Sequence, residues 1–422
     1  MKRVCVLGID CMSPTIVFGS MRDQLPNLAK LLDESNFGIL ESAFPPTTIP
    51  AWMSMFTGKT PGELGVYGFK HRHGHPMHEP IRAVSRLDFQ AKPIWEWADR
   101  KGHESVIVGC PATWPASSLR GAMLTDFTTP SGHVSVHPRD YASLLEPDWQ
   151  WDLENWRHLP RNNILENLKT LSHGYWSTFE AMLDRHPNWA LAVMVDIGMD
   201  RAQHLFWEPM LDEGEAPSHN SPLWEYYRYT DARIGEFLNR LEPTTSLLIV
   251  SDHGAQSMRG CFSLNQWLIN HGLLILKEAV SDVVRPEHVD WNASKWWGEG
   301  GYVGKLHASS KHRSSIHGDI DELRTLLERD GLQSRITLTT PGEVYPEVRG
   351  NPPNAFVTVD NYQIRCIGSI DESASLWRED NDLGSDAANH HPDGLFIAKG
   401  LDQRFKPRHQ LRDVYHWIQE AL

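Results

Sequence analysis

The sequence predicts an α/β fold with a mostly parallel central sheet, and three observations support this prediction. Short apolar runs rich in β-branched residues recur along the chain. Their apolarity is continuous rather than alternating, which is typical of strands covered on both faces. Helix-like segments separate them, as in layered α/β proteins. With 422 residues, the chain can form one large α/β unit with an insertion, or two domains.

The predicted elements alternate along the chain. Five runs are expected to be strands of such a sheet: VCVLGI (4–9), SVIVG (105–109), ALAVMV (190–195), SLLIV (246–250) and AFVTV (355–359). Helices are expected between them, over 25–35, 91–102 and 229–243. Each helix has the apolar spacing of one buried face.

Two stretches interrupt this alternation. The segment near 128–161 is rich in Pro, His and Trp, and the segment 277–350 combines weak strand signals with a charged helix over 319–331. We interpret both as insertions over one face of the sheet. This interpretation divides the chain into a three-layer αβα core over 1–276 and 351–422, and an inserted cap segment over 277–350.

The composition excludes several classes of partner. The formal net charge is −14 and no block of Lys and Arg occurs, which argues against a nucleic-acid polymer or a membrane as partner. The N-terminal apolar stretch is too short for a signal peptide, and no transmembrane span is visible. Five scattered cysteines without C-x-x-C spacing fit reduced thiols. We therefore expect a cytoplasmic protein, and homo-oligomerisation stays open.

Acids and histidines follow the predicted strands. Asp10 ends the first strand, Asp196 follows the run 190–195, and "SDHG" follows the run 246–250. Ligands of open α/β sheets bind at the carboxyl ends of the strands, so these side chains are expected to converge.

Two pairs of these residues have the spacing of metal ligands. Asp200 and His204 are four residues apart, which on a helix places both on one face, although a solvated contact is the commoner role of such a pair. Asp252 and His253 are adjacent, and in extended chain they point apart, which suits a bridge between two centres. Asp and Gly are also ordinary turn residues, so "SDHG" alone has a structural alternative.

A further pair of imidazoles stands near the C-terminus. "NHHPDGLFIAKG" offers His390 and His391 before a Pro-Asp-Gly turn. One ion could be held by Asp10, Asp252 and His253, and a second by Asp200, His204 and His390. Mixed carboxylate and imidazole ligands suit Zn²⁺, with Mn²⁺ or Fe as alternatives. Two such ions about 4 Å apart can clamp the attacking and leaving oxygens of a phosphoryl displacement.

Two neighbouring hydroxyls lie in the stretch PPTTIPAWMSMFTGKTPGELG (45–65). Thr47 and Thr48 precede an apolar, helix-like run, where a threonine ordinarily caps the helix. A nucleophile that attacks an anionic phosphoryl group also benefits from a helix N-terminus. The predicted metal ligands favour this second role for one of the two.

The motifs GIDCMSP, FPPTTIPAWMSMFTGKTPGELGV, DRAQH, SDHG and HHPDG, in this order and with these intervals, resemble the type I phosphodiesterase/nucleotide pyrophosphatase branch of the alkaline phosphatase superfamily. The resemblance covers most of the chain and fails mainly in the two insertions. It implies an alkaline phosphatase-like three-layer αβα sandwich with a mostly parallel sheet and inserted cap segments. It also implies a two-zinc hydrolase whose threonine nucleophile is transiently phosphorylated.

The resemblance also implies residue roles. A T-x-P element selects Thr48 as nucleophile and leaves Thr47 as its capping or structural neighbour. In the family's pattern, Asp10, Asp252 and His253 bind the ion that activates the nucleophile and that Thr48 also contacts. The second ion is bound by Asp200, His204 and a histidine of an "H-x-P-x-G" element, which selects His390 rather than His391, with the register open by one residue.

One departure from the family's pattern concerns the phosphate oxygens. Nucleotide pyrophosphatases of this branch carry an Asn where this chain has Phe69, and a His where it has Leu64. Other donors must then hold the phosphoryl oxygens, and Lys70, His71 and Arg72 directly follow. A solvated surface loop is an equally good interpretation of this cluster.

These observations predict a metal-dependent hydrolase of a phosphodiester or phosphoanhydride, which forms a phosphothreonine on Thr48 and uses two divalent ions. The expected partner is a small phosphorylated, nucleotide-like substrate. Hydrolysis of a phosphate monoester, phosphonate or sulfate ester at the same site is the alternative. A non-catalytic metal-binding scaffold is a third interpretation, and the full set of ligands argues against it. Trp52, Trp207, Trp296 and Trp297 could stack on a base or sugar, but tryptophan is more commonly a core residue.

Overall fold

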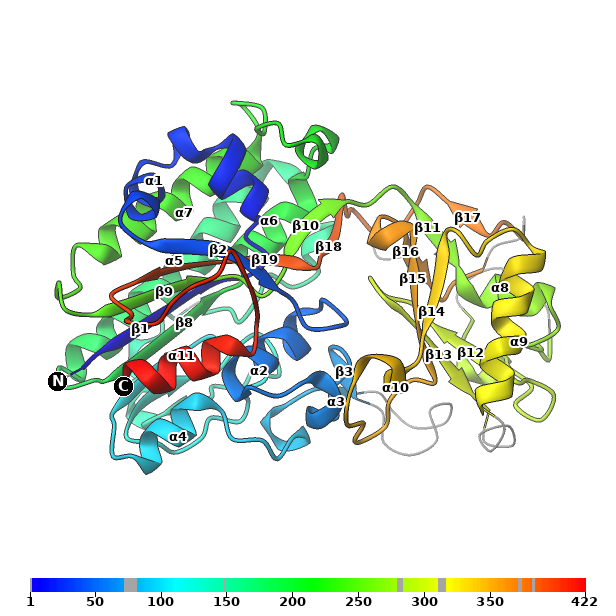
Figure 1. The fold of residues 1–422 in the computed structure, drawn as a ribbon, viewed down its shortest axis with the longest axis horizontal. Helices are drawn as coiled ribbons and strands as arrows, with labels where there is room; N and C mark the ends of the chain where they lie inside the picture. The colour runs from blue at the N-terminus through cyan, green and yellow to red at the C-terminus, as the bar shows by residue number, and fades with distance from the viewer. Residues whose placement is uncertain are drawn as a thin grey trace.

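The fold consists of a large lobe around a long sheet and a smaller, separate lobe, as Figure 1 shows. The computed structural model describes residues 2–71, 82–147, 149–278, 284–309, 316–370, 374–381 and 384–422. Within these residues, no helix is both long enough and apolar enough to cross a membrane.

The large lobe contains a nine-stranded sheet. In spatial order its strands are β20 (Arg408–Gln410), β2 (Asn36–Glu41), β19 (Asp393–Lys399), β9 (Ser246–Val250), β1 (Val4–Ile9), β8 (Leu191–Asp196), β5 (Ser105–Val108), β6 (Gly121–Leu124) and β7 (Val136–His137). The central pairings β9–β1, β1–β8, β8–β5 and β5–β6 are parallel. Strand β19 runs antiparallel to both neighbours, and β7 runs antiparallel to β6. The predicted α/β class with a mostly parallel sheet is confirmed.

Each face of this sheet is covered by helices, which explains the continuous apolar runs. Alternate residues of a strand face opposite sides, so Leu7 and Ile9 belong to one core, and Val4 and Val6 belong to the other. The first core contains residues of α1 (Pro26–Asp33), α5 (Arg161–Arg185), α6 (Gly198–Phe206) and α7 (Pro222–Leu238). The second contains residues of α2 (Thr48–Thr57), α4 (Ile94–Arg100) and α11 (Asp413–Ala421). The sheet and the helices on its two faces therefore form three layers.

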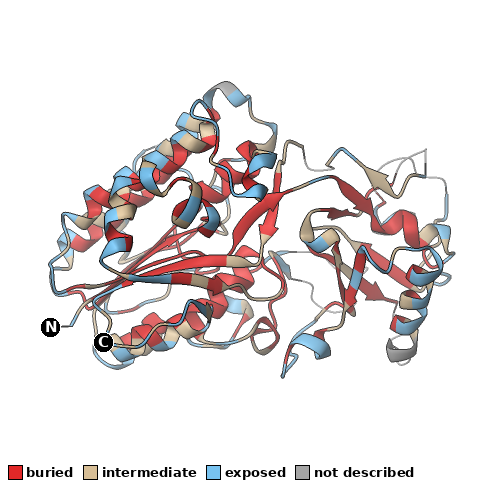
Figure 2. Cartoon of the chain, turned by 45° about the horizontal axis from the view of Figure 1, so that its top comes forward, coloured by how far each residue is buried: buried red, intermediate tan, exposed pale blue. Residues whose placement is uncertain are grey.

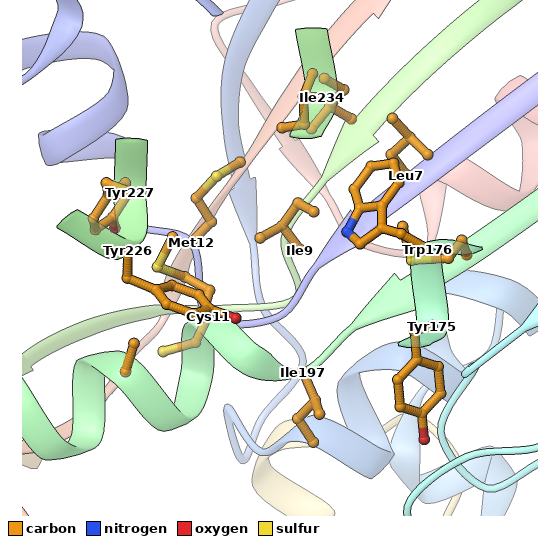
Figure 3. Packing of buried hydrophobic residues seen from close by; sticks show 14 of the residues in the cluster. Leu7, Ile9, Cys11, Met12, Tyr175, Trp176, Ile197, Tyr226, Tyr227 and Ile234 are labelled. Atoms are coloured by element: carbon orange, nitrogen blue, oxygen red, sulfur yellow. The ribbon is translucent and has the colours of Figure 1, made fainter. Parts of the chain in front are cut away.

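Large aromatic side chains fill the first core. Figure 3 shows Trp176 and Tyr226 among the residues of this core, together with Leu7, Cys11 and Met12. In Figure 2 the strands of the large sheet are mostly red, meaning buried. All ten residues of α2 are buried too, so this helix has no solvent face.

The smaller lobe has its own sheets and its own core. A four-stranded sheet has the order β12 (Trp296–Glu299), β13 (Gly304–Ala308), β15 (Ala355–Val359) and β14 (Ile336–Thr339). A three-stranded sheet has the order β16 (Arg365–Ile367), β11 (Cys261–Ser263) and β17 (Trp377–Arg378). The helices here are α8 (Leu264–Asn270), α9 (Ile316–Arg329) and α10 (Pro341–Val344), as Figure 1 shows.

One strand prediction was wrong about the sheet to which the strand belongs. The strand expected at 355–359 exists, but β15 pairs antiparallel with β13 and β14 in the smaller lobe. Its apolarity is continuous because Val357 and Val359 face the core of that lobe, whereas Phe356 packs with Tyr67 and Tyr345 in a second cluster. Continuous apolarity therefore indicates burial on both faces and does not identify the sheet.

The division into a core and an inserted cap remains a proposal. The pairing of β15, β16 and β17 with strands from 261 onward leads us to propose that the inserted part extends over about 261–378 rather than 277–350. The segment near 128–161 contributes β7 to the edge of the large sheet, so it does not lie wholly over one face.

A glycine in β1 sets how closely α2 approaches the sheet. A Cβ built at Gly8 would lie 2.5 Å from the ring of Trp52 and 2.9 Å from Val195. We expect Gly8→Ala to lower the free energy of unfolding by about 1–3 kcal/mol, as overpacked cores do. Urea denaturation measures this loss. Gly19→Ala is the matched control, because a Cβ at Gly19 meets nothing within 4 Å; equal losses for the two variants would contradict the packing argument.

Candidate active site

The predicted site residues come from segments that follow parallel strands. Asp10 directly follows β1, and Asp252 and His253 follow β9. Helix α6 follows β8 and carries Asp200 and His204. His390 lies in β18 (Ala388–His391), where it pairs with Ala255 of β10 (Gly254–Ser257).

The structure brings six of these residues into two adjacent clusters. Site A consists of Asp10, Asp252 and His253, and site B consists of Asp200, His204 and His390. In site A, Nε2 of His253 lies 3.2 Å from Oδ2 of Asp252 and 3.7 Å from Oδ1 of Asp10. In site B, Oδ1 of Asp200 lies 3.4 Å from Nε2 of His204 and 3.6 Å from Nε2 of His390, and the two Nε2 atoms are 3.1 Å apart.

These distances fit ligands of a shared metal ion. Ligand atoms about 2.0–2.2 Å from a tetrahedral ion lie roughly 3.3–3.6 Å from one another. In the described part of the chain, Oδ1 of Asp10, Oδ1 of Asp200, Oδ2 of Asp252 and Nε2 of His253 are buried and have no hydrogen-bond partner. Buried polar atoms without partners are costly, and a divalent cation at each cluster would satisfy them.

The opposite ring nitrogen of each histidine is held by an oxygen. Nδ1 of His390 donates to the carbonyl of Pro46 at 2.7 Å, and Nδ1 of His253 donates to the carbonyl of Gly254 at 3.2 Å. Nδ1 of His204 lies 2.8 Å from Oδ1 of Asp386. A neutral imidazole that donates from Nδ1 presents the lone pair of Nε2 toward the cluster, which is the usual arrangement of metal-bound histidine.

Asp386 is a site residue that sequence reasoning missed. Its side chain is fully buried and also accepts from Nε of Arg157 at 2.9 Å. The only signal was its place four residues before His390, and an isolated acid at that spacing predicts no specific contact. Arg157 comes from the segment near 128–161, so this insertion reaches the surroundings of site B.

The neighbours of Thr48 in the chain contact one residue of each site. Thr48 is the first residue of α2, and its Oγ1 is buried without a hydrogen-bond partner in the described structure. Two residues earlier, Pro46 accepts the bond from His390; one turn later, Nε1 of Trp52 donates to Oδ2 of Asp10 at 2.8 Å. Thr47 occupies the N-cap position, but its side chain makes no capping hydrogen bond.

The electrostatics of site A favour a cation. Burial, reinforced by neighbouring carboxylates, raises the pKa of Asp10 and of Asp252 well above the usual range. Burial lowers the pKa of His253 and of His390, so both imidazoles are neutral near pH 7. Neutral imidazole and deprotonated carboxylate are the metal-binding forms, and a bound cation would reverse the carboxyl shifts.

Site B is shaped by opposite charges. Burial alone would raise the pKa of Asp200, but His204, His390 and Arg201 lower it well below the usual range. Arg201 is itself held by Asp152, with Nη2 2.5 Å from Oδ2. Burial lowers the pKa of His204, but Asp386 and Asp200 outweigh this effect and raise it to about 9. His204 must therefore lose a proton when an ion binds.

These shifts predict how the stability of the metal-free protein depends on pH. The folded-state pKa values of Asp10, Asp252 and His204 are raised above those of the unfolded chain, so their contribution is present at low pH and lost as pH rises. The contribution of His204 to stability is complete below about pH 6.5 and is lost as the pH rises through about 9. The lowered pKa values of His253 and His390 act in the opposite direction, and their contribution to stability is complete above about pH 7.5. We therefore expect the Tm in chelator to fall between pH 7.5 and 9.5, and the gain in Tm on adding Zn²⁺ to grow. A Tm in chelator that is flat or rises over this interval would contradict the assignment.

The other predicted residues that the structure describes lie outside the two clusters. Lys70 is exposed on β3 (Lys70–His71), whereas Arg72 and the side chain of His71 lie outside the described residues. His391 is partly buried and accepts from the amide of Asp393. Each tryptophan considered for stacking is buried: Trp52, Trp207, Trp296 and Trp297. Their burial favours the core role.

Cys11 lies between the two sites and was not predicted there. Its Sγ is grouped with Asp200 and His253, and its backbone has a φ of 63°, a conformation uncommon for residues with a side chain. Its amide donates to Oδ1 of Asp252 at 3.2 Å, so this turn orients one ligand of site A. All five cysteines are unpaired and buried, which is consistent with reduced thiols.

Comparisons with known proteins agree with this fold. The family model described as type I phosphodiesterase/nucleotide pyrophosphatase matches residues 4–346. No curated protein sequence matches the chain. Among solved structures, phosphonoacetate hydrolase from Sinorhizobium meliloti 1021, in complex with phosphonoformate, is similar with a TM-score of 0.65 and 14% identity, over 100% of this chain and 96% of that one. Murine ectonucleotide pyrophosphatase/phosphodiesterase 5 is similar with a TM-score of 0.59 and 14% identity, over the same shares. Its inactive form in complex with AMP has a TM-score of 0.60 and 12% identity.

Proposed function

This chain belongs to the type I phosphodiesterase/nucleotide pyrophosphatase family, and from that premise we propose that it hydrolyses a small phosphodiester or phosphoanhydride with Thr48 as nucleophile. Site A and site B would each hold one divalent ion, with Zn²⁺ as the proposed metal. We propose a nucleotide-like substrate and the cytoplasm as compartment.

The observation that carries this proposal is a set of buried polar atoms without partners, on Thr48 and in the two sites. Oγ1 of Thr48 and four ligand-type atoms of the two sites are buried without hydrogen-bond partners in the described residues. A structural role would normally pair such atoms, whereas a two-ion centre uses all of them. Two bound ions would supply the positive charge that activates a hydroxyl and neutralises a leaving oxygen.

The remaining chemistry belongs to residues of the chain. Thr48 attacks phosphorus: the Oγ–P bond forms, the bond from phosphorus to the leaving oxygen breaks, and the hydroxyl proton ends on the leaving group. Water then cleaves the phosphothreonine and returns a proton to Oγ1. Trp52 and Pro46 hold the start of α2 against one ligand of each site, which fixes the direction of attack.

A second candidate function is hydrolysis of a phosphonate or phosphate monoester. It is favoured by Phe69, which, by the family resemblance, stands where nucleotide pyrophosphatases of this branch carry an Asn. The Phe69 ring packs 6.3 Å from the ring of Phe127 and can donate no hydrogen bond to a phosphoryl oxygen. A substrate with more charge on phosphorus would then depend on the metal ions and on basic side chains.

The test compares four substrate classes on the purified protein loaded with Zn²⁺ or Mn²⁺. We expect a chromogenic phosphodiester to be cleaved with a higher kcat/KM than the matched monoester, phosphonate and sulfate ester. A higher value for the phosphonate or the monoester would establish the second candidate instead. Absence of turnover for all four classes, with two ions bound, would favour a non-catalytic scaffold.

A further inference from the structure

Tyr302 of the smaller lobe lies directly against the histidines of site B. It belongs to the link between β12 and β13. Its ring stacks on the ring of His204, with 4.9 Å between centroids and 12° between planes. The centroid of His390 is 4.3 Å away, at 36°. Thus one aromatic ring contacts two of the three ligands of site B.

The hydroxyl of Tyr302 joins the buried group behind His204. It lies 3.3 Å from Oδ2 of Asp386 and 3.4 Å from Nδ1 of His204, and it accepts a hydrogen bond from Arg157. The guanidinium of Arg365 lies 4.8 Å from the ring centroid of Tyr302. Four residues that are distant in the sequence therefore meet on this one side chain.

The backbone of Tyr302 is also tied to the strand that carries His390. Nδ2 of Asn389 donates to the carbonyl of Tyr302 at 3.4 Å. By contrast, no ring contact between Tyr302 and His253 of site A occurs among the described residues. The smaller lobe thus contacts site B through Tyr302, whereas the ligands of site A come from the loops of the large lobe.

We propose that Tyr302 is a positioning residue that makes metal binding at site B depend on the smaller lobe. Three ligands bind one ion tightly only when their donor atoms are held within a fraction of an ångström. The Tyr302 ring restricts the ring planes of His204 and His390, and its hydroxyl supports the Asp386 contact that orients His204. The inference rests on the proposed two-ion centre.

The test measures metal binding on the full-length protein, stripped of metal and titrated with Co²⁺, whose visible absorption reports each bound ion. Asp200→Asn, which removes a ligand, identifies the signal of site B. We expect Tyr302→Ala to weaken Co²⁺ binding at site B about 10–100-fold, as loss of an outer contact to a ligand does, and to leave site A within twofold. Tyr302→Phe, which keeps the ring, is expected to lose less.

Tyr345→Ala is the matched control for attachment of the smaller lobe. Tyr345 is a buried tyrosine of the same lobe that packs against Tyr67 and Phe356 and donates to the carbonyl of Phe44, and no metal ligand is among these partners. We expect both Co²⁺ affinities to stay within twofold in this variant. An equal loss in Tyr345→Ala and Tyr302→Ala, or no loss in Tyr302→Ala, would overturn the proposal.

Hydrogen exchange tests the same link in the unaltered protein. Coupling between two parts of a protein is reciprocal. If the smaller lobe supports metal binding at site B, an ion at site B should in turn slow hydrogen exchange of the backbone amides in 296–305. We expect this slowing in the wild type and its absence in Asp200→Asn. Unchanged exchange on filling site B would overturn the proposal. If the wild type binds no pair of ions, the proposed function fails. If it binds both ions but Tyr302→Ala loses no affinity at site B, only the role of Tyr302 fails, so the two failures are distinguishable.

Discussion

Replacement of Thr48 by alanine is expected to lower kcat by about 10³-fold or more, as loss of a nucleophile does, while both ions remain bound. The six proposed ligands of sites A and B stay in place, and only the proposed attacking oxygen is lost. Steady-state rates with the best substrate of the panel measure the loss, and elemental analysis of the dialysed protein measures the bound metal.

Thr47→Ala provides the matched control one residue earlier. Its hydroxyl makes no capping hydrogen bond to α2, so we expect kcat within a few-fold of the wild type. Phosphate that stays attached to the wild-type protein after acid quench, and is absent from Thr48→Ala, would identify the phosphothreonine. If Thr47→Ala inactivates and Thr48→Ala does not, the nucleophile has been assigned to the wrong hydroxyl.

Asp252→Asn is expected to remove the ion of site A with little change of shape. Oδ1 of Asp252 accepts from the amide of Cys11, and an asparagine oxygen can keep that bond. The unsatisfied Oδ2 becomes an NH₂ group, which cannot bind a cation. We expect metal affinity at site A to fall at least about 10²-fold, beyond the range for outer contacts, and turnover at limiting metal to fall with it.

The same variant has a signature in stability. Burial raises the pKa of Asp252, so the ionised carboxylate destabilises the metal-free fold at high pH. We expect Asp252→Asn to raise the Tm in chelator at pH 9 and to lower the Tm in Zn²⁺.

Asp196→Asn is the control for the Asp252 variant. Asp196 is also buried, but it accepts from Trp176 and from the amide of Gly198. We expect Asp196→Asn to lower the free energy of unfolding by about 1–3 kcal/mol with or without metal. A lower Tm in chelator for Asp252→Asn would contradict its assignment as a ligand.

Sequence reasoning found the large sheet and both clusters for a definite physical reason. Residues 4–9 and 246–250 are buried on both faces, so their apolar runs coincide with β1 and β9. The carboxyl ends of parallel strands share one edge, which is why Asp10 and Asp252 could be grouped before their separation was known. The choice of Thr48 over Thr47 came from the family resemblance and not from residue patterns.

What sequence reasoning missed depends on contacts between distant segments. Asp386, Arg157 and Tyr302 meet around His204, and each is ordinary in its own stretch of chain. Helix α5 was not among the helices named from the sequence, although its apolar spacing was readable: Ile164, Leu168, Leu171 and Tyr175 are buried at intervals of three and four. For strand 355–359, two different clusters cover its two faces, and only the fold identifies them.

The complete burial of α2 has a consequence for how this protein can evolve. A surface helix tolerates substitutions on its solvent-exposed face, but the helix Thr48–Thr57 has no such face. Substitutions along it should therefore be tolerated only when a neighbour changes in compensation. The proposed nucleophile thereby lies in a helix without an exposed face, so new specificities are expected to arise in the loops that surround the helix.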